Sequence, residues 1–283
     1  MRFDRIGVVG SGTMGNGIAH VFAVAGLPVC LVDLEQDFLN RAVASIKKNL
    51  DRQLKKEIIT SAQRQAALEA ITTSTDTAAL AGCALVVEAV TENRELKKKI
   101  FAQLEEVVSA ECILASNTST ISISELAGQL RFPQRFIGMH FMNPAPLMQL
   151  VEVITAIQTS EATATAIVEL AEKIGKKAVV VRDSPGFVLN RILIPMINEA
   201  ICALDAGIAD ATAIDSCMKL GANHPIGPLA LGDLIGLDVC LTIMEVLFAD
   251  FGDPKYRPSP LLRRMVAAHM LGRKSGTGFF TYD

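Results

Sequence analysis

The fold of this chain is decided by residues 5–33, which read RIGVVGSGTMGNGIAHVFAVAGLPVCLVD. The apolar, β-branched run that opens the stretch predicts a buried strand, and three spaced glycines follow it directly. A segment with helical periodicity comes next, and a second apolar strand ends on Asp33. Strand, glycine-rich turn, helix and second strand with a terminal acid together predict a dinucleotide-binding unit.

Each glycine of the loop has a physical task in this interpretation. Gly10 allows the tight turn, Gly12 lets the backbone approach a pyrophosphate, and Gly15 lets helix and strand pack closely. The helix N-terminus offers N–H groups and a partial positive charge to the phosphates. The candidate cofactor site therefore begins with the whole loop: Gly10, Ser11, Gly12, Thr13, Met14 and Gly15.

Asp33 indicates which dinucleotide is bound. Its carboxylate can accept hydrogen bonds from the adenosine ribose, and its negative charge repels the 2′-phosphate of NADP. We therefore expect NAD as the cofactor and regard NADP as disfavoured.

The composition is that of a globular protein with a large core. The 283 residues suggest two domains, and 50% of them are hydrophobic. No uncharged apolar run reaches the roughly 18 residues of a membrane span, and the first strand begins too early for a signal peptide. We therefore expect a cytoplasmic protein with no membrane partner.

The net charge of −3 argues against nucleic acid as a partner. The six cysteines lack the spacing of metal ligands, so we expect reduced thiols in the core and no metal site.

Strands and helices alternate over the first two thirds of the chain, which predicts a Rossmann-type, doubly wound α/β domain over residues 1–183. Strands are expected at 5–9, 29–32, 71–74, 85–88, 113–116, 136–140, 150–154 and 178–181. Helices are expected at 15–25, 94–108 and 161–174, among others. Two helical patterns separate the second and third strands, so we expect a helical arm at about 35–70 to project from the sheet.

The pattern changes after Asp183, where strand patterns nearly vanish. Helical segments are expected at 187–204, 209–220, 227–248 and 260–269, which predicts an all-helical substrate and dimerisation domain over residues 184–283. These helices carry apolar residues on more than one face. We therefore expect self-association through this domain, as a homodimer or a dimer of dimers.

A second informative stretch, residues 138–154, reads GMHFMNPAPLMQLVEVI. If its two apolar runs pair as an antiparallel hairpin centred near residue 146, His140 lies opposite Glu152. A carboxylate beside an imidazole fixes its tautomer and raises its basicity, as a general base requires. The alternative is a core histidine with a structural partner.

Small polar residues end the fifth expected strand, where the chain reads LASNTSTIS from residue 114. Ligands of doubly wound folds bind at the carboxyl ends of strands, so these hydroxyls and amides can hold a nicotinamide and a substrate oxygen. The alternative is that they cap a helix.

Basic residues gather on the arm: Lys47, Lys48, Arg52, Lys55 and Lys56. In an acidic protein such a local basic face invites a phosphate-rich ligand. The alternative is a charged helix face that is merely solvated.

Further motifs are more specific than a general dinucleotide fold. They are GSGTMG, ILASNTS, GMHFMNPAP, LVEVI, SPGFVLNRILIPMINEA, KLGANHPIGPLALGD and GRKSGTGF, spread over essentially the whole chain. In these motifs the chain resembles the 3-hydroxyacyl-CoA dehydrogenases, and within that family the bacterial 3-hydroxybutyryl-CoA dehydrogenases.

The resemblance implies that NAD oxidises an (S)-3-hydroxyacyl-CoA to the 3-oxoacyl-CoA, or the reverse. The family's catalytic set falls on His140, Glu152, Ser119 and Asn190, the last reaching in from the helical domain. Its cofactor contacts fall on the glycine loop, Asp33, Glu92, Lys97, Asn117, Ser119 and Asn143. Its acyl-CoA contacts fall on Arg52, Lys56, Ser119 and Asn190.

Two alternatives stand beside this interpretation. Other hydroxyacid dehydrogenases with a helical second domain rely on a catalytic lysine, where this chain offers His140 and Glu152. A non-enzymatic dinucleotide-binding protein can share the same fold, although the intact His–Glu–Ser–Asn set argues against it.

Overall fold

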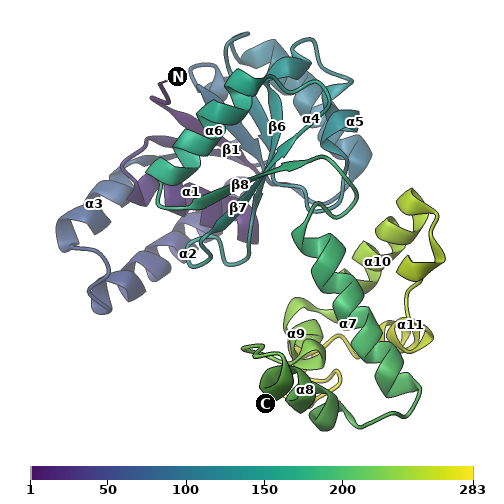
Figure 1. Cartoon of the computed structure of the whole chain (residues 1–283). Helices are drawn as coiled ribbons and strands as arrows, with labels where there is room; N and C mark the ends of the chain where they lie inside the picture. The colour runs from purple at the N-terminus through teal and green to yellow at the C-terminus, as the bar shows by residue number, and fades with distance from the viewer. Residues whose placement is uncertain (1, 283) are drawn as a thin grey trace. The chain divides into compact units, whose positions relative to one another are not determined.

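The computed structural model describes residues 2–282, and the chain divides into two compact units, the first ending at Asp183 and the second beginning at Ser184 (Figure 1). Each unit has its own hydrophobic core. Among the described helices, none combines the length and the apolar character needed to cross a bilayer.

The first unit is built on one eight-stranded sheet with the order β3-β2-β1-β4-β5-β6-β7-β8. The strands are β1 (Ile6–Val9), β2 (Val29–Val32), β3 (Ile71–Ser74), β4 (Leu85–Glu88), β5 (Ile113–Ser116), β6 (Phe136–Phe141), β7 (Leu150–Thr155) and β8 (Lys177–Arg182). All neighbours are parallel except β6 and β7, which are antiparallel. The order of the first six strands is that of a Rossmann fold, as predicted.

The predicted strand bounds are confirmed to within one residue at each end. β2, β3, β4 and β5 have the predicted bounds, while β1, β6, β7 and β8 differ by one residue at one or both ends. Apolar runs locate a buried strand well, whereas its last residue depends on a hydrogen bond to a neighbouring strand.

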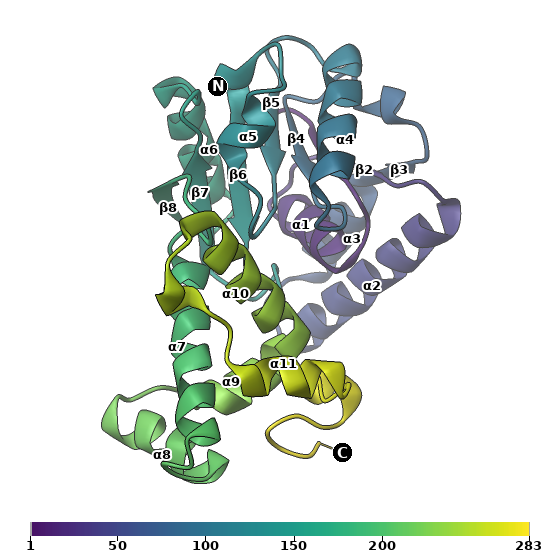
Figure 2. The same ribbon diagram turned by 90° about the vertical axis from the view of Figure 1, so that its right-hand side faces the viewer.

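Helices cover both faces of this sheet (Figures 1 and 2). One face carries α1 (Thr13–Val24), α2 (Gln36–Lys55), α3 (Ser61–Glu69) and α6 (Glu161–Lys173), and the other carries α4 (Arg94–Val107) and α5 (Ile123–Ala127). On the second face Phe101 of α4 meets Phe136 of β6 edge to face, with 4.7 Å between the ring centroids. The carboxyl edge of the sheet lies between these two layers.

The predicted arm is formed by α2 and α3. The apolar side of α2 is fully buried in the core of the unit through Leu39, Ile46 and Leu50. An ion pair of 2.6 Å between Arg64 and Asp51 links α3 to α2. The arm therefore packs against α1 along part of its length, and its far end extends away from the sheet (Figure 1).

The second unit is mainly helical, with two isolated antiparallel bridges, Gly272–Thr277 and Thr277–Thr281, near its end. Its helices are α7 (Leu189–Asp205), α8 (Ala211–Gly221), α9 (Pro228–Ile235), α10 (Leu237–Phe251) and α11 (Pro260–Ala267). The predicted bounds of these helices differ from the observed ones by up to three residues, and two differences have a clear cause. The first helix starts at Leu189 because Phe187 has a φ of 52°, and the helix expected over 227–248 is two helices because Gly236, with a φ of 104°, interrupts it.

All six cysteines are free, as predicted, but they are not all core residues. Cys30, Cys83, Cys112 and Cys240 are buried, whereas Cys217 is exposed. Cys217 stands between Ser216 and Met218, with Asp215 and Lys219 on either side, so the apolar run expected around it is absent.

Candidate active site

The glycine-rich loop between β1 and α1 shows which glycines the protein itself requires. Gly10 has a φ of 92°, and a Cβ there would lie 2.7 Å from the carbonyl oxygen of Ala89. A Cβ on Gly15 would overlap the carbonyl oxygen of Gly10. A Cβ on Gly12 would meet no heavy atom of the protein within 4 Å. Packing therefore explains Gly10 and Gly15, and the space over Gly12 remains for a ligand.

The N-terminus of α1 suits an anionic ligand. No side chain caps it, and its first turn holds no acidic residue. The first N–H groups of a helix have no partner within the helix and carry the positive end of its dipole. A pyrophosphate over Gly12 would meet these groups, so the loop fits a dinucleotide.

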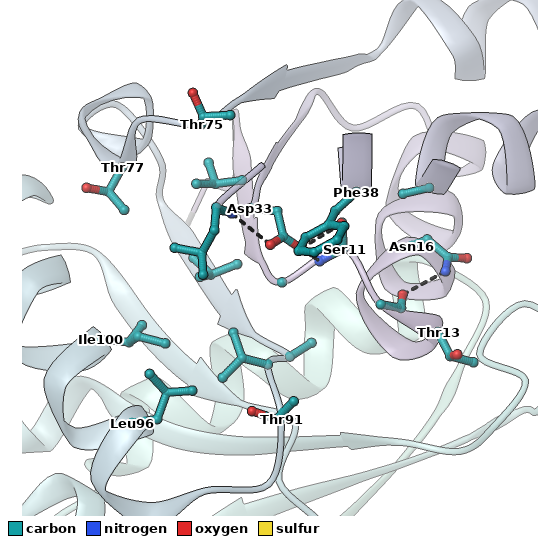
Figure 3. Close-up of a pocket in the computed structure, with 18 of the residues that line it drawn as sticks. Ser11, Thr13, Asn16, Asp33, Phe38, Thr75, Thr77, Thr91, Leu96 and Ile100 are labelled. Carbon is teal, nitrogen blue, oxygen red and sulfur yellow. Dashed lines mark hydrogen bonds between the residues drawn. The ribbon is translucent and has the colours of Figure 1, made fainter. Parts of the chain in front are cut away.

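A cleft of about 750 Å³ opens beside the loop, within the usual range for small-molecule sites (Figure 3). Its lining comes from the glycine loop and Asp33, from α2 and α4, and from the segment after β3. The walls, which sequence reasoning missed, include Phe38, Arg41, Thr75, Thr77, Leu96 and Ile100. The sequence did offer a signal for Phe38, because this aromatic residue lies just after Asp33 and next to, not within, the buried side of α2.

Asp33 lines this cleft beside Ser11 (Figure 3). Its Oδ2 accepts hydrogen bonds from the backbone N–H and the hydroxyl of Ser11, both at 2.6 Å, and its Oδ1 accepts one from the N–H of Leu34 at 2.7 Å. The carboxylate is therefore fixed at the carboxyl end of β2, where the Rossmann pattern places the adenosine ribose.

The predicted pairing of His140 with Glu152 is confirmed by the strand register. The antiparallel ladder of β6 and β7 sets the two residues opposite each other, and Nδ1 of His140 lies 2.8 Å from Oε2 of Glu152. Both are buried, with 7% and 2% of their surface exposed. An ionised carboxylate at Glu152 only accepts hydrogen bonds, so it would hold the shared proton on Nδ1 of His140.

Asn117 follows β5 and forms hydrogen bonds to the two neighbouring strands at the carboxyl edge of the sheet. Its Oδ1 accepts a hydrogen bond of 2.9 Å from the N–H of Phe141, the residue after His140. Its own N–H donates to the carbonyl oxygen of Glu88 at the end of β4. The carboxyl ends of β4, β5 and β6 are thereby joined beside the His140–Glu152 pair.

The side chain of Glu92 accepts hydrogen bonds from the segment that carries Ser119. One carboxylate oxygen, Oε1, accepts hydrogen bonds from the N–H groups of Ser119 and Thr120 at 2.9 and 3.0 Å and from the hydroxyl of Thr118 at 2.5 Å. Burial would raise the pKa of Glu92, but nearby Lys97 and these hydrogen bonds outweigh it and hold that pKa below its usual range. Glu92 is therefore a charged anchor for this segment.

The other predicted site residues lie in four places. Lys97 is buried in the first turns of α4 and pairs with Glu88 and Glu92. Asn143 is exposed in the loop between β6 and β7, and Arg52 and Lys56 are exposed on the arm. Asn190 lies in the first turn of α7 in the second unit. The roles predicted for all these residues stay predictions.

Comparison with known proteins agrees with this architecture. Residues 5–184 match the family model described as 3-hydroxyacyl-CoA dehydrogenase, NAD binding domain, and residues 186–282 match the model of the C-terminal domain of the same family.

Individual relatives match over nearly the whole chain. The 3-hydroxybutyryl-CoA dehydrogenase of Bradyrhizobium diazoefficiens is 51% identical, covering 98% of this chain and 95% of the relative. That of Clostridioides difficile is 47% identical and covers 99% of each. The crystal structure of (S)-3-hydroxybutyryl-CoA dehydrogenase from Ralstonia eutropha superposes with a TM-score of 0.97 at 51% identity, covering 100% of both chains.

Proposed function

The chain belongs to the 3-hydroxyacyl-CoA dehydrogenase family, and from that premise we propose that it interconverts (S)-3-hydroxyacyl-CoA and 3-oxoacyl-CoA with NAD. The four-carbon substrate, 3-hydroxybutyryl-CoA, is the first to expect, since the relatives named above carry that name. The observation that carries the proposal is the buried His140–Glu152 pair at the carboxyl edge of a dinucleotide-binding sheet.

His140 is the proposed general base and acid. NAD, when bound, accepts the hydride that leaves C3 of the substrate. In this direction Nε2 of His140 removes the hydroxyl proton, and in the reverse direction it returns that proton to the oxygen. Glu152 keeps the proton on Nδ1 and stabilises the imidazolium through their 2.8 Å contact. The pair can do this with little reorganisation because both side chains are buried.

Ser119 and Asn190 are the proposed groups that position the substrate oxygen. Ser119 follows β5 and is held by Glu92, so its hydroxyl is presented from a fixed segment at the carboxyl edge. Asn190 would contribute its amide from α7 of the second unit. Arg52 and Lys56 would meet the phosphates of coenzyme A on the exposed face of the arm.

The cofactor contacts follow from the same edge. The glycine loop would hold the pyrophosphate and Asp33 the adenosine ribose, with Glu92, Lys97, Asn117 and Asn143 serving the nicotinamide half. A fixed negative charge at Asp33 favours NAD over NADP, since the additional 2′-phosphate would be repelled.

The helical unit has the proposed second role of self-association. Its described surface exposes several large apolar side chains, among them Ile192 at 66%, Ile208 at 76% and Leu220 at 88%. Burying such residues against a second copy would give a homodimer or a dimer of dimers. Six free cysteines suit the reducing cytoplasm, where we place the enzyme.

The direct test mixes the protein with NADH and acetoacetyl-CoA and follows the absorbance of NADH. The proposed function predicts its consumption, and butyryl-CoA, which lacks the 3-oxo group, serves as the matched control that should leave NADH intact. Binding of NADH without consumption would favour the non-enzymatic dinucleotide-binding alternative.

A further inference from the structure

A buried carboxylate that the proposed mechanism does not use lies at the end of β4. Glu88 has 0% of its surface exposed. Its Oε1 accepts hydrogen bonds from the ammonium of Lys97 at 2.6 Å and from the N–H of Val90 at 2.7 Å, and its Oε2 accepts one from the hydroxyl of Ser116 at 2.7 Å. Glu88 therefore joins the ends of β4 and β5 to the start of α4.

Lys97 connects this carboxylate to a second one. Its side chain is 1% exposed, and its Nζ lies 3.4 Å from Oε2 of Glu92 as well as 2.6 Å from Oε1 of Glu88. Glu92 is 34% exposed and uses its other oxygen, Oε1, to hold Thr118, Ser119 and Thr120. Charges of alternating sign thus run from the interior of the sheet to the segment that carries Ser119.

The energetics favour a positioning role over a purely stabilising one. Burying an ion pair costs desolvation, and well-packed apolar residues would stabilise the same place as well or better. A buried ion pair does, however, fix the orientation of its two side chains, because a fully desolvated ammonium and carboxylate hold each other in one geometry. At this edge of the sheet orientation has a use, since the chain of contacts ends at a candidate substrate group.

We propose that Glu88 is a positioning residue, which with Lys97 sets the carboxylate of Glu92 and thereby the Thr118–Thr120 segment that presents Ser119. This rests on the proposed function, because it gives Ser119 a substrate contact. Without the charge of Glu88, the ammonium of Lys97 has Glu92 as its remaining carboxylate partner. Lys97 then draws Oε2 of Glu92 inward, and the segment on Oε1 shifts with it.

The test is a double-mutant cycle between Glu88→Gln and Ser119→Ala, read as kcat/KM for acetoacetyl-CoA at saturating NADH, because Lys97 and Glu92 are also proposed cofactor contacts. Glu88→Gln keeps the shape of the side chain and removes its charge, and Ser119→Ala removes the hydroxyl while leaving the backbone bond to Glu92. If Glu88 acts through Ser119, Glu88→Gln lowers kcat/KM about tenfold in the wild type and less than about twofold once the hydroxyl is gone. The same loss in both backgrounds would overturn the proposal.

Asp233→Asn is the matched control for losing a buried carboxylate. Asp233 is 1% exposed and accepts hydrogen bonds from the N–H groups of Phe279 and Phe280, both at 3.0 Å, in the second unit. It lies outside the Glu88–Lys97–Glu92 contacts, so its effect on kcat/KM should be the same with and without the Ser119 hydroxyl. The proposal would be contradicted if the effects of Asp233→Asn and Glu88→Gln on kcat/KM depended equally on the Ser119 hydroxyl.

A second variant and a second readout keep the test decisive. If Glu88→Gln fails to fold, Glu88→Asp keeps the charge but withdraws the carboxylate from its 2.6 Å contact with Lys97, and its smaller loss should show the same dependence on Ser119. The backbone amide NMR signals of Ser119 and Thr120 report the segment without any turnover. They should move in the Glu88 variants and stay in Asp233→Asn. An inactive wild type would refute the proposed function alone, whereas unmoved signals would refute the positioning role.

Discussion

Replacing Glu152 by Gln tests the charge of the proposed catalytic pair while keeping its shape. A hydrogen bond between charged partners is worth about 1.5–3 kcal/mol, against about 0.5–1.5 kcal/mol for a neutral one, so the variant loses about 1–2 kcal/mol of imidazolium stabilisation. Solvent does not screen this loss, because His140 and Glu152 are 7% and 2% exposed. At 1.36 kcal/mol per factor of ten, kcat should fall about 5- to 30-fold.

The assay for this variant is kcat for oxidation at saturating NAD and (S)-3-hydroxybutyryl-CoA, the direction in which the imidazolium forms, together with the Kd of NADH and the thermal unfolding midpoint. NADH binding should change by less than about twofold, since the loss concerns the charged imidazole and not the cofactor cleft. Glu111→Gln, at a side chain 79% exposed, is the matched control and should keep the wild-type kcat. A folded Glu152→Gln enzyme with kcat within about twofold of wild type would mean that the buried pair is only structural.

Three further outcomes are expected. Asp33→Ala should weaken NADH binding and narrow the preference over NADPH, because the ribose acceptor and the repulsion of the 2′-phosphate are both lost; an unchanged ratio of the two Kd values would place the discrimination elsewhere. Residues 1–183 alone should bind NADH, remain monomeric by light scattering and show no turnover, and a dimer of this fragment would contradict an interface on the helical unit. Glu92, whose pKa in the folded protein lies below the ordinary 4.5, contributes stability that is present above about pH 4.5 and is lost as the pH falls through the folded value. The difference in unfolding midpoint between wild type and Glu92→Gln should therefore shrink in acid, and a difference that does not vary with pH would contradict the assignment.

The parts of this molecule that the sequence predicts well have a local or countable cause. Apolar runs placed the inner strands β1, β2, β4, β5 and β6 to within one residue at each end, because burial on both faces demands such runs, whereas the edge strands β3 and β8 are largely exposed. The pairing of His140 with Glu152 was predictable because a hairpin register follows from counting residues to its centre.

The parts that the sequence does not predict depend on tertiary contacts without a local signal. Glu88 ends an apolar strand, and its partner Lys97 lies nine residues further on in a helix. Neither the strand pattern nor the helix pattern therefore predicts a buried ion pair between them. The break at Gly236 falls inside an unbroken apolar periodicity, and a single positive φ turns one expected helix into two. The walls of the cleft come from three separate elements that meet only in the folded unit.

The central claim of this account is that His140 transfers the substrate proton. The most direct measurement compares wild type and His140→Ala in two assays, the Kd of NADH by fluorescence and the rate of NADH consumption with acetoacetyl-CoA. We predict that NADH binding stays within about twofold while kcat falls by about 10²–10⁴-fold, the usual cost of losing a general acid or base. A His140→Ala enzyme that binds NADH and turns over at nearly the wild-type rate would contradict the account.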